Sequence, residues 1–311
     1  MQYIIGVDIG GTTIKIGFFN KQGNLQNKWE IPTDISDKGK NIIGDIAASI
    51  KEYLTKNKIN LNECLGIGIG VPGAVSNNLC VGCVNLGWDA LDIGMELGKY
   101  FPGILIKAEN DANCAALGEV YNLNGKYQNA CLITIGTGVG GGIIYQGKIL
   151  TGSNGASGEI GHFKVVFENG RICGCGKSGC LETVASANGI VEELKRILKE
   201  GRLKTKFSLE QKFSTKDIFA RENASDPAII EVKKTFFHYL GIAVSYLTLV
   251  TNPEVVIIGG GVSKGLKEEL LKINRYFQKY SFAPSEQTEI ILAELLNDAG
   301  IFGAAQLIRY A

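Results

Sequence analysis

Two segments of this chain place a glycine-rich turn between β-branched stretches. The first runs YIIGVDI, GGTT and IKIGFFN over residues 3–20, and the second runs CLITI, GTGVGGG and IIYQ over residues 131–146. β-Branched residues favour strands, and glycine adopts the backbone angles of tight turns without steric cost. Each segment therefore predicts a strand, a tight turn and a returning strand, so the fold must contain β-sheet.

The glycine content also decides against a membrane span. Glycine makes up 41 of the 311 residues, against a usual share of about 7%. Residues 127–147 carry no charge and are long enough to cross a bilayer, but each of the five glycines at 136–142 would cost a helix roughly 1 kcal/mol relative to alanine. Met1–Tyr3 has no basic signal region, and Asp8 interrupts the first apolar run. We expect no membrane segment, no signal peptide and a cytoplasmic protein.

The charges are nearly balanced, with 32 Lys and Arg residues against 31 Asp and Glu residues and a formal net charge of +1. This balance argues against a nucleic-acid partner and against a polybasic membrane anchor. A hydrophobic content of 45% is ordinary for a globular chain, and 311 residues suit one large domain or two medium ones.

Apolar periodicity extends the α/β pattern along the chain. We expect further strands over 25–31, 65–71, 104–108 and 254–258, and helices over 41–54, 182–199, 226–250 and 264–278. The basic segment 200–215 should form a surface loop. The tetrapeptide Ile9–Thr12 is echoed by Ile135–Gly138, each time between strands, which predicts two related α/β halves.

Glycine turns of this kind expose backbone N–H groups that can bind phosphate oxygens. The sequence lacks GxxxxGK[ST] and lacks GxGxxG at a strand-to-helix junction, so neither a P-loop nor a dinucleotide site is predicted. Asp8 precedes the first turn, and a carboxylate beside phosphates requires a cation between them, which indicates Mg²⁺. The alternative is that Gly10–Thr13 and Gly136–Gly138 are only tight hairpins.

One histidine and three cysteines have the spacing H-x10-C-x-C-x4-C, at His162, Cys173, Cys175 and Cys180. Three thiolates and one imidazole make a closed tetrahedral Zn²⁺ site, which would be structural because no position is left for water. The alternative is a cluster of reduced thiols. The remaining cysteines receive no role: Cys64, Cys80, Cys83, Cys114 and Cys131.

Carboxylates suited to acid–base chemistry lie at two places. Asn110 and Asp111 lie where a strand ends and a helix begins, the usual position of ligand contacts in an open α/β sheet. Asp111 would accept a hydroxyl proton and Asn110 would position a neighbouring hydroxyl, although either residue can simply cap the helix. Glu159 and Glu182 flank the predicted zinc site and would bind a polyol or remain solvated.

Seven ordered motifs give the whole chain a resemblance to the ROK family of sugar kinases and repressors. They are DIGGTTIK (8–15), GVPGAV (70–75), ENDANCAALGE (109–119), TIGTGVGGGI (134–143), GEIGH (158–162), CGCGKSGCLET (173–183) and NPEVVIIGGGVS (252–263). The resemblance implies the actin-like ATPase (ribonuclease H-like) fold, with ATP in a cleft between two related α/β domains. It implies a first domain of residues 1–117 and 298–311, to which a helix over about 299–310 returns, and a second domain of residues 118–297.

The resemblance also assigns site residues. Asp111 would be the general base, and His162 would serve both zinc and sugar. The implied sugar-binding residues are Asn110, Glu159, His162, Glu182, Gly73 and Asn85. The implied residues for ATP and its Mg²⁺ are Asp8, Gly10, Gly11, Thr12, Thr13, Lys15, Gly136, Thr137, Gly138, Gly259, Gly260 and Gly261.

The segments VNLGWDALDI (84–93) and IPTD (31–34) resemble the glucose-phosphorylating branch of this family. They imply phosphoryl transfer from ATP to the 6-hydroxyl of glucose. N-acetylmannosamine or another hexose is the alternative substrate, and a sugar-sensing protein without turnover is the alternative class. We expect a small-molecule sugar as ligand and a homo-oligomer, dimer or tetramer.

Overall fold

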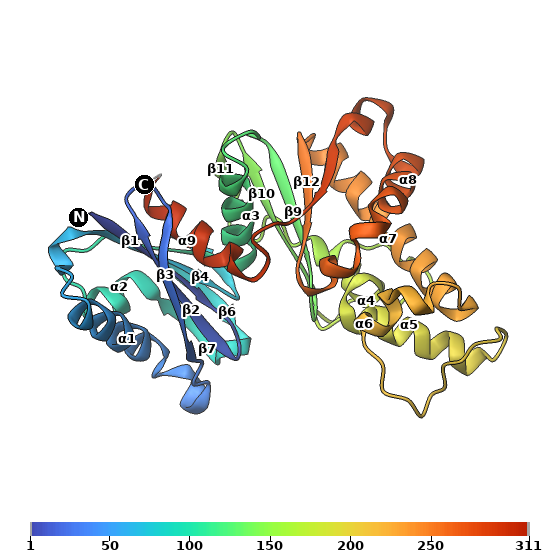
Figure 1. Cartoon of the computed structure of the whole chain (residues 1–311), viewed down its shortest axis with the longest axis horizontal. Helices are drawn as coiled ribbons and strands as arrows, with labels where there is room; N and C mark the ends of the chain where they lie inside the picture. Colours follow the sequence, from blue (N-terminus) through green and yellow to red (C-terminus); the bar gives the residue numbers. More distant parts are fainter. Residues whose placement is uncertain (1, 310–311) are drawn as a thin grey trace. The chain divides into compact units, whose positions relative to one another are not determined.

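The computed structural model describes residues 2–309, and the chain divides into two compact units (Figure 1). Unit 1 comprises Met1–Gln128, Gly142–Gly158 and Asn297–Ala311, and unit 2 comprises Asn129–Gly141 and Glu159–Leu296. The expected first domain, residues 1–117 and 298–311, lies within unit 1, which also contains residues 118–128 and 142–158, so that helix α3 (Asp111–Asn122) is not divided. The C-terminal helix expected over about 299–310 is α9 (Ala299–Arg309), and residues 310–311 lie outside the described part.

A five-stranded mixed sheet forms the framework of unit 1. Its order is β3-β2-β1-β4-β8, where β1 runs antiparallel to β2 and parallel to β4. The strands are β1 (Tyr3–Ile9), β2 (Thr13–Asn20), β3 (Leu25–Pro32), β4 (Cys64–Val71) and β8 (Ile106–Asn110). The parallel strands β1, β4 and β8 end at one edge, with Asp8 aligned with Gly70 and Gly70 aligned with Glu109. This edge carries the first candidate site.

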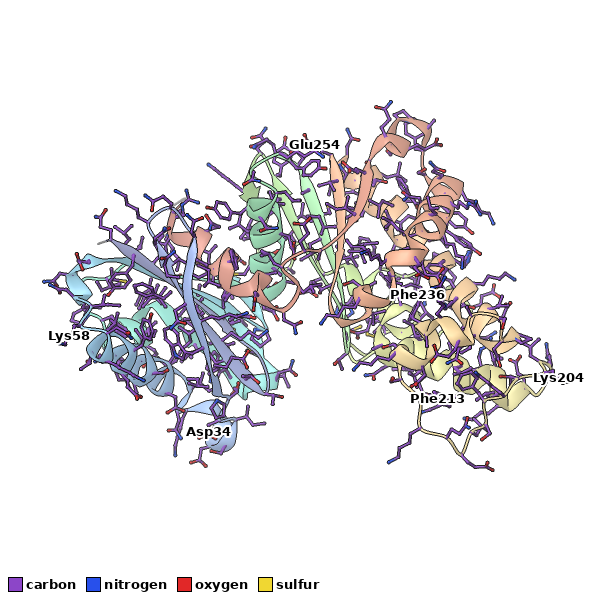
Figure 2. All side chains as sticks on the ribbon, viewed as in Figure 1. Asp34, Lys58, Lys204, Phe213, Phe236 and Glu254 are labelled. Carbon is purple, nitrogen blue, oxygen red and sulfur yellow. The ribbon has the colours of Figure 1, made fainter. Side chains whose placement is uncertain are left out.

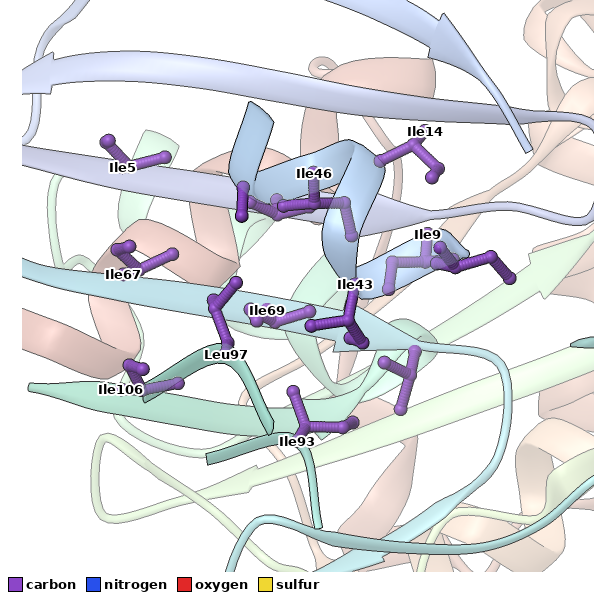
Figure 3. Packing of buried hydrophobic residues seen from close by; sticks show 14 of the residues in the cluster. Ile5, Ile9, Ile14, Ile43, Ile46, Ile67, Ile69, Ile93, Leu97 and Ile106 are labelled. Atoms are coloured by element: carbon purple, nitrogen blue, oxygen red, sulfur yellow. The ribbon is translucent and has the colours of Figure 1, made fainter. Parts of the chain in front are cut away.

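Helices α1 (Ile42–Lys56) and α2 (Ile93–Gly98) lie on one face of this sheet. Figure 3 shows Ile43 of α1 and Leu97 of α2 among the isoleucines of the strands, such as Ile67 and Ile69. These side chains are buried, and their removal from water is the main force that holds the layer together.

Helix α9 approaches the sheet so closely that several strand positions must be glycine. A Cβ atom on Gly6 would lie 2.2 Å from the carbonyl oxygen of Ile301, and one on Gly68 would lie 1.7 Å from that of Ala304. The alternation of glycine with isoleucine in β4 therefore reflects two faces, with glycine toward α9 and isoleucine toward the other helix layer.

A small antiparallel sheet of order β5-β6-β7 follows β4 and was not predicted from the sequence. Its strands are β5 (Ala74–Ser76), β6 (Leu79–Cys83) and β7 (Trp88–Asp92). Asn77 and Asn78 form the tight β5–β6 turn, both with positive φ. The Asn78 side chain accepts a hydrogen bond from the N–H of Ala108 at 2.7 Å, so this hairpin is tied to the edge strand β8.

The second large sheet has the order β11-β10-β9-β12-β13, which repeats the plan of the first and agrees with the predicted internal echo. Its strands are β9 (Ala130–Ile135), β10 (Val139–Tyr145), β11 (Lys148–Ile149), β12 (Val255–Gly259) and β13 (Glu289–Leu292). The helices of unit 2 are α4 (Glu182–Ala185), α5 (Ala187–Glu200), α6 (Thr215–Phe219), α7 (Pro227–Thr251) and α8 (Leu270–Tyr280).

Three predicted boundaries in this half were wrong. Strand β10 begins at Val139, so the turn is only Gly136–Gly138 and the following glycines belong to the strand. The helix expected over 182–199 breaks at Ser186, whose hydroxyl caps α5 by accepting the N–H of Gly189. The helix expected from 264 begins at Leu270, after two 3₁₀ turns.

The long loop between α5 and α6 agrees with the expected surface segment at 200–215. Figure 2 shows Lys204 and Phe213 on this loop, whereas Phe236 lies among the packed side chains of α7. Among residues 2–309, no helix combines the length and the apolar character that crossing a bilayer requires.

Candidate functional site

The junction between β8 and α3 holds the predicted acid–base pair. Asn110 is the N-cap of α3, because its Oδ1 accepts the backbone N–H groups of Ala112 at 2.9 Å and Asn113 at 3.1 Å. Its Nδ2 donates to the carbonyl oxygen of Gly73 at 3.1 Å. Asp111 is the first helical residue, is partly exposed, and accepts the Ala112 N–H at 2.8 Å. The capping interpretation therefore holds for Asn110, and its amide also joins the junction to Gly73.

Asp8 lies at the same edge of the sheet, near the end of β1. Burial raises the pKa of its carboxyl from 3.8 to about 6, while Lys15, its partner across the β1–β2 pair, lowers it. The first turn of α9 contributes to this burial, since a Cβ on Gly300 would lie 2.5 Å from the Asp8 carboxyl carbon. In the adjacent turn, Gly10 donates its N–H to the Thr13 carbonyl at 3.0 Å. This edge brings Asp8, the first glycine turn, Gly73 and Asp111 into one unit.

Two other predicted glycine segments lie side by side in unit 2. Gly260 has a φ of +83°, and a Cβ there would lie 2.5 Å from the carbonyl oxygen of Ile135. Ile135 directly precedes the turn Gly136–Gly138, and Gly259 is paired with Thr134 across β12 and β9. A Cβ on Gly136 or on Gly261 would meet no atom within 4 Å apart from its neighbours along the chain. Open backbone of this kind can approach a ligand closely.

Glu182 lies against the second glycine turn. Its Oε2 accepts the N–H of Val139 at 3.2 Å. A Cβ on Gly138 would lie 2.3 Å from this oxygen, so a larger residue there would displace the Glu182 carboxylate. The other oxygen, Oε1, accepts the Cys173 thiol at 3.4 Å. Glu182 therefore connects the glycine turn with the cysteine loop.

The predicted zinc ligands come together. One ligand atom from each of His162, Cys173, Cys175 and Cys180 lies within 4.8 Å of the others. The Sγ atoms of Cys175 and Cys180 are 3.8 Å apart, and Cys173 Sγ lies 3.5 Å from His162 Nδ1. A tetrahedral zinc with sulfur ligands at about 2.3 Å holds neighbouring sulfurs about 3.8 Å apart, so this donor set fits the ion.

The second nitrogen of His162 faces away from the cysteines. Its Nε2 lies 3.8 Å from Glu159 Oε2, and both side chains are about half exposed. The predicted sugar-binding residues Glu159, His162 and Glu182 are thus neighbours in unit 2. A metal-bound thiolate has no proton, so a zinc ion would end the contact of Cys173 with Glu182.

One predicted residue has no partner. Asn85 lies exposed on a 3₁₀ turn, and its side chain makes no hydrogen bond with a residue in the described range 2–309. Conversely, sequence reasoning gave no role to Cys80 and Cys83. A Cβ on Gly73 would lie 3.0 Å from Cys80 Sγ, and Cys83 Sγ donates to the Pro72 carbonyl at 3.2 Å. Only their nearness in sequence to Gly73 hinted at this packing.

The remaining three cysteines are buried and separate from the cluster of His162, Cys173, Cys175 and Cys180. Burial raises the pKa of the Cys64 and Cys131 thiols to about 11, and it also raises that of Cys114. Such thiols are packing groups with little reactivity at neutral pH.

Comparison with known proteins extends these observations. A glucokinase of Halalkalibacterium halodurans is 39% identical over 99% of this chain and 95% of that protein. An N-acetylgalactosamine kinase of Shewanella is 30% identical over 97% of this chain and 95% of that protein. The structure is also similar to the crystal structure of a ROK family glucokinase from Streptomyces griseus in complex with glucose and AMPPNP. The TM-score is 0.77 and the sequence identity is 28%, over 99% of this chain and all of that chain.

The structural likeness identifies the mixed α/β architecture as the actin-like ATPase fold that the motifs implied. The sequence pattern of the ROK family matches residues 4–311. With that match and these relatives, the chain belongs to the ROK family.

Proposed function

We propose that this protein transfers the γ-phosphoryl group of ATP to the 6-hydroxyl of glucose. The observation that carries the proposal is the identity of 39% to a glucokinase along almost the whole chain. The carboxylate and the amide that lie together at the β8–α3 junction support it. A related glucokinase was crystallised with glucose and AMPPNP, which supports ATP as the donor.

In this proposal Asp111 is the general base. Its carboxylate accepts the proton of the sugar hydroxyl while the oxygen attacks the γ-phosphorus in line, and the bond to the departing ADP breaks. Asn110, held by Gly73, orients a neighbouring hydroxyl. Most of the rate gain comes from positioning and charge stabilisation, because the phosphoryl group itself needs little covalent assistance.

We assign the remaining candidates to binding. Asp8 would hold the Mg²⁺ of the nucleotide, which supplies neutralisation of the phosphate charge. Backbone N–H groups of Gly10, Gly11, Thr12, Thr13, Gly136, Thr137 and Gly138, with Lys15, bind the phosphates, and Gly259–Gly261 lie against the adenosine. Glu159, His162, Glu182, Gly73 and Asn85 contact the sugar. Zinc would stabilise the cysteine loop without taking part in the reaction.

The relative that phosphorylates an N-acetylated hexosamine supports a second candidate substrate class. An ADP-release assay with glucose, mannose, N-acetylmannosamine and N-acetylgalactosamine tests both. We expect the highest kcat/KM for glucose. A higher kcat/KM for an N-acetylated sugar would show that this sugar, and not glucose, is the substrate. The absence of ADP release with any sugar would favour a sugar-sensing protein.

A further inference from the structure

We propose that Glu109 is a positioning residue for the Asn110–Asp111 junction and that it acts through Asn113. This inference rests on the proposed function of Asp111 and Asn110, to which it adds the group that holds them. Glu109 is the last residue but one of β8 and is only 8% exposed.

A single oxygen of Glu109 receives two hydrogen bonds. Its Oε1 accepts the backbone N–H of Asn110 at 2.9 Å and the side-chain Nδ2 of Asn113 at 3.1 Å. Asn113 lies in the first turn of α3 and is 1% exposed. The carboxylate therefore joins the end of the strand to the start of the helix, across the two residues that the reaction uses.

The chemistry of these donors fixes the orientation of the Asn113 amide. The Asn110 N–H can only donate, so the shared oxygen must be an acceptor, and Asn113 must present its NH₂ group to it. The Asn113 Oδ1 is consequently left buried without a hydrogen bond among the described residues. Leaving a buried oxygen without a hydrogen bond costs free energy. The Asn113 amide keeps this orientation because its bond to Glu109 offsets that cost.

Stability alone does not explain a carboxylate here. Burial raises the pKa of Glu109, and no Lys or Arg in the described range pairs with it. A neutral side chain of the same shape would avoid the desolvation of a charge. The negative charge strengthens both hydrogen bonds, and these fix the backbone from which Asn110 caps α3 and holds Gly73.

Two single variants and their combination test the inference. Glu109→Gln keeps an oxygen for Asn110 but weakens both bonds, and Asn113→Asp places two carboxylates against each other. We expect kcat for the sugar to fall about tenfold or more in Asn113→Asp. This is the factor that corresponds to the free energy of one hydrogen bond to a charged group. The double variant Glu109→Gln/Asn113→Asp removes the repulsion between the two carboxylates, because the NH₂ group introduced at position 109 can donate to the carboxylate introduced at position 113, in place of the bond that the Asn110 N–H makes. It should therefore recover part of this loss, while the KM for ATP stays near that of the wild type.

Glu269→Gln serves as the matched control, because Glu269 is equally buried but binds Lys233 and Lys272, neither of which is a proposed site residue. It should lower stability and leave kcat unchanged. Full activity in folded Asn113→Asp, or no recovery in the double variant, would overturn the inference.

A second readout separates this inference from the proposed function. Amide hydrogen exchange at Ala112 and Asn113 should accelerate in Asn113→Asp and slow again in the double variant, with no sugar or ATP present. If the wild type phosphorylates no sugar, the proposed function fails while this exchange pattern still tests the contact. Unchanged exchange in all variants would reject it.

Discussion

Asp111 follows the residue whose side chain caps α3, so its carboxylate is held at the start of a helix. Asp111→Asn retains an oxygen for the Ala112 N–H and removes the base. We expect kcat to fall by about 100-fold or more, the usual contribution of general base catalysis, while the sugar dissociation constant measured by calorimetry changes little. Activity above one tenth of the wild-type value would contradict the assignment.

Asp8 should make stability depend on pH. Its pKa is about 6 in the folded chain against an ordinary value of 3.8, so folding favours the protonated form. The stability that this group contributes is complete below about pH 4 and is lost as the pH rises through 6. The Asp8→Asn variant should not lose this stability as the pH rises. Its unfolding free energy at pH 7.5 should exceed that of the wild type by at most about 3 kcal/mol.

Urea unfolding at pH 4 and pH 7.5, without ATP and Mg²⁺, measures this difference. The same variant should lose phosphoryl transfer, because Asp8 is proposed to hold Mg²⁺. An equal change of unfolding free energy with pH in the variant and the wild type would show that another group is responsible.

Among the elements, the crossing of α3 and α9 depends on a glycine. A Cβ on Gly303 would lie 1.6 Å from the carbonyl oxygen of Cys114. Gly303→Ala should therefore force the helices apart and lower the melting temperature by several degrees or more. In α2, a Cβ on Gly98 meets no atom closer than 3.9 Å, so Gly98→Ala should be neutral or stabilise by about 0.5–1 kcal/mol. Similar melting temperatures for both variants would contradict this account.

The cysteine loop has little regular structure of its own between Phe163 and Leu181. We expect metal analysis to find about one zinc per chain. Removal of zinc with a chelator should lower the melting temperature and increase proteolysis in this loop, as should Cys180→Ser. Cys131→Ser, which alters a buried thiol outside the cluster, should leave the zinc content unchanged. Retention of stability and activity after complete removal of zinc would reject the structural role.

Unit 1 is assembled from three separate segments of the chain, and the last of them carries α9. Ile301, Ala305 and Ile308 of α9 form a buried cluster with Ile4 and Phe19 of the first two strands. Ending the chain at Leu296 exposes this cluster and the glycine face of the sheet, so we expect unit 1 to lose cooperative unfolding. Circular dichroism during thermal unfolding measures this, and adding a peptide of residues 297–309 should partly restore it. An intact transition in the truncated chain would contradict the expectation.

Much of the fold could be predicted because local signals and the final structure agree. Strands β1, β2 and β3 and helices α1 and α7 lie within two residues of their expected ends. In α1, the apolar residues at helical spacing are the ones that the structure buries. The sequence did not predict the hairpin of β5 and β6, because its strands are short. Its only clear sequence signal is the turn at Asn77 and Asn78. Helix α8 was placed too early because 3₁₀ turns precede it with similar apolar spacing.

The sequence by itself determined the family, the α/β class, the glycine turns and the spacing of the clustered histidine and cysteines, because each depends on residue types at fixed offsets along the chain. Only the tertiary structure decided which groups become neighbours. It joined Asn110 to Gly73, laid Gly260 against Ile135, and buried Asp8 beneath Gly300. These contacts join residues through the packing of sheets and helices, and local sequence carries no record of the distances that such packing creates.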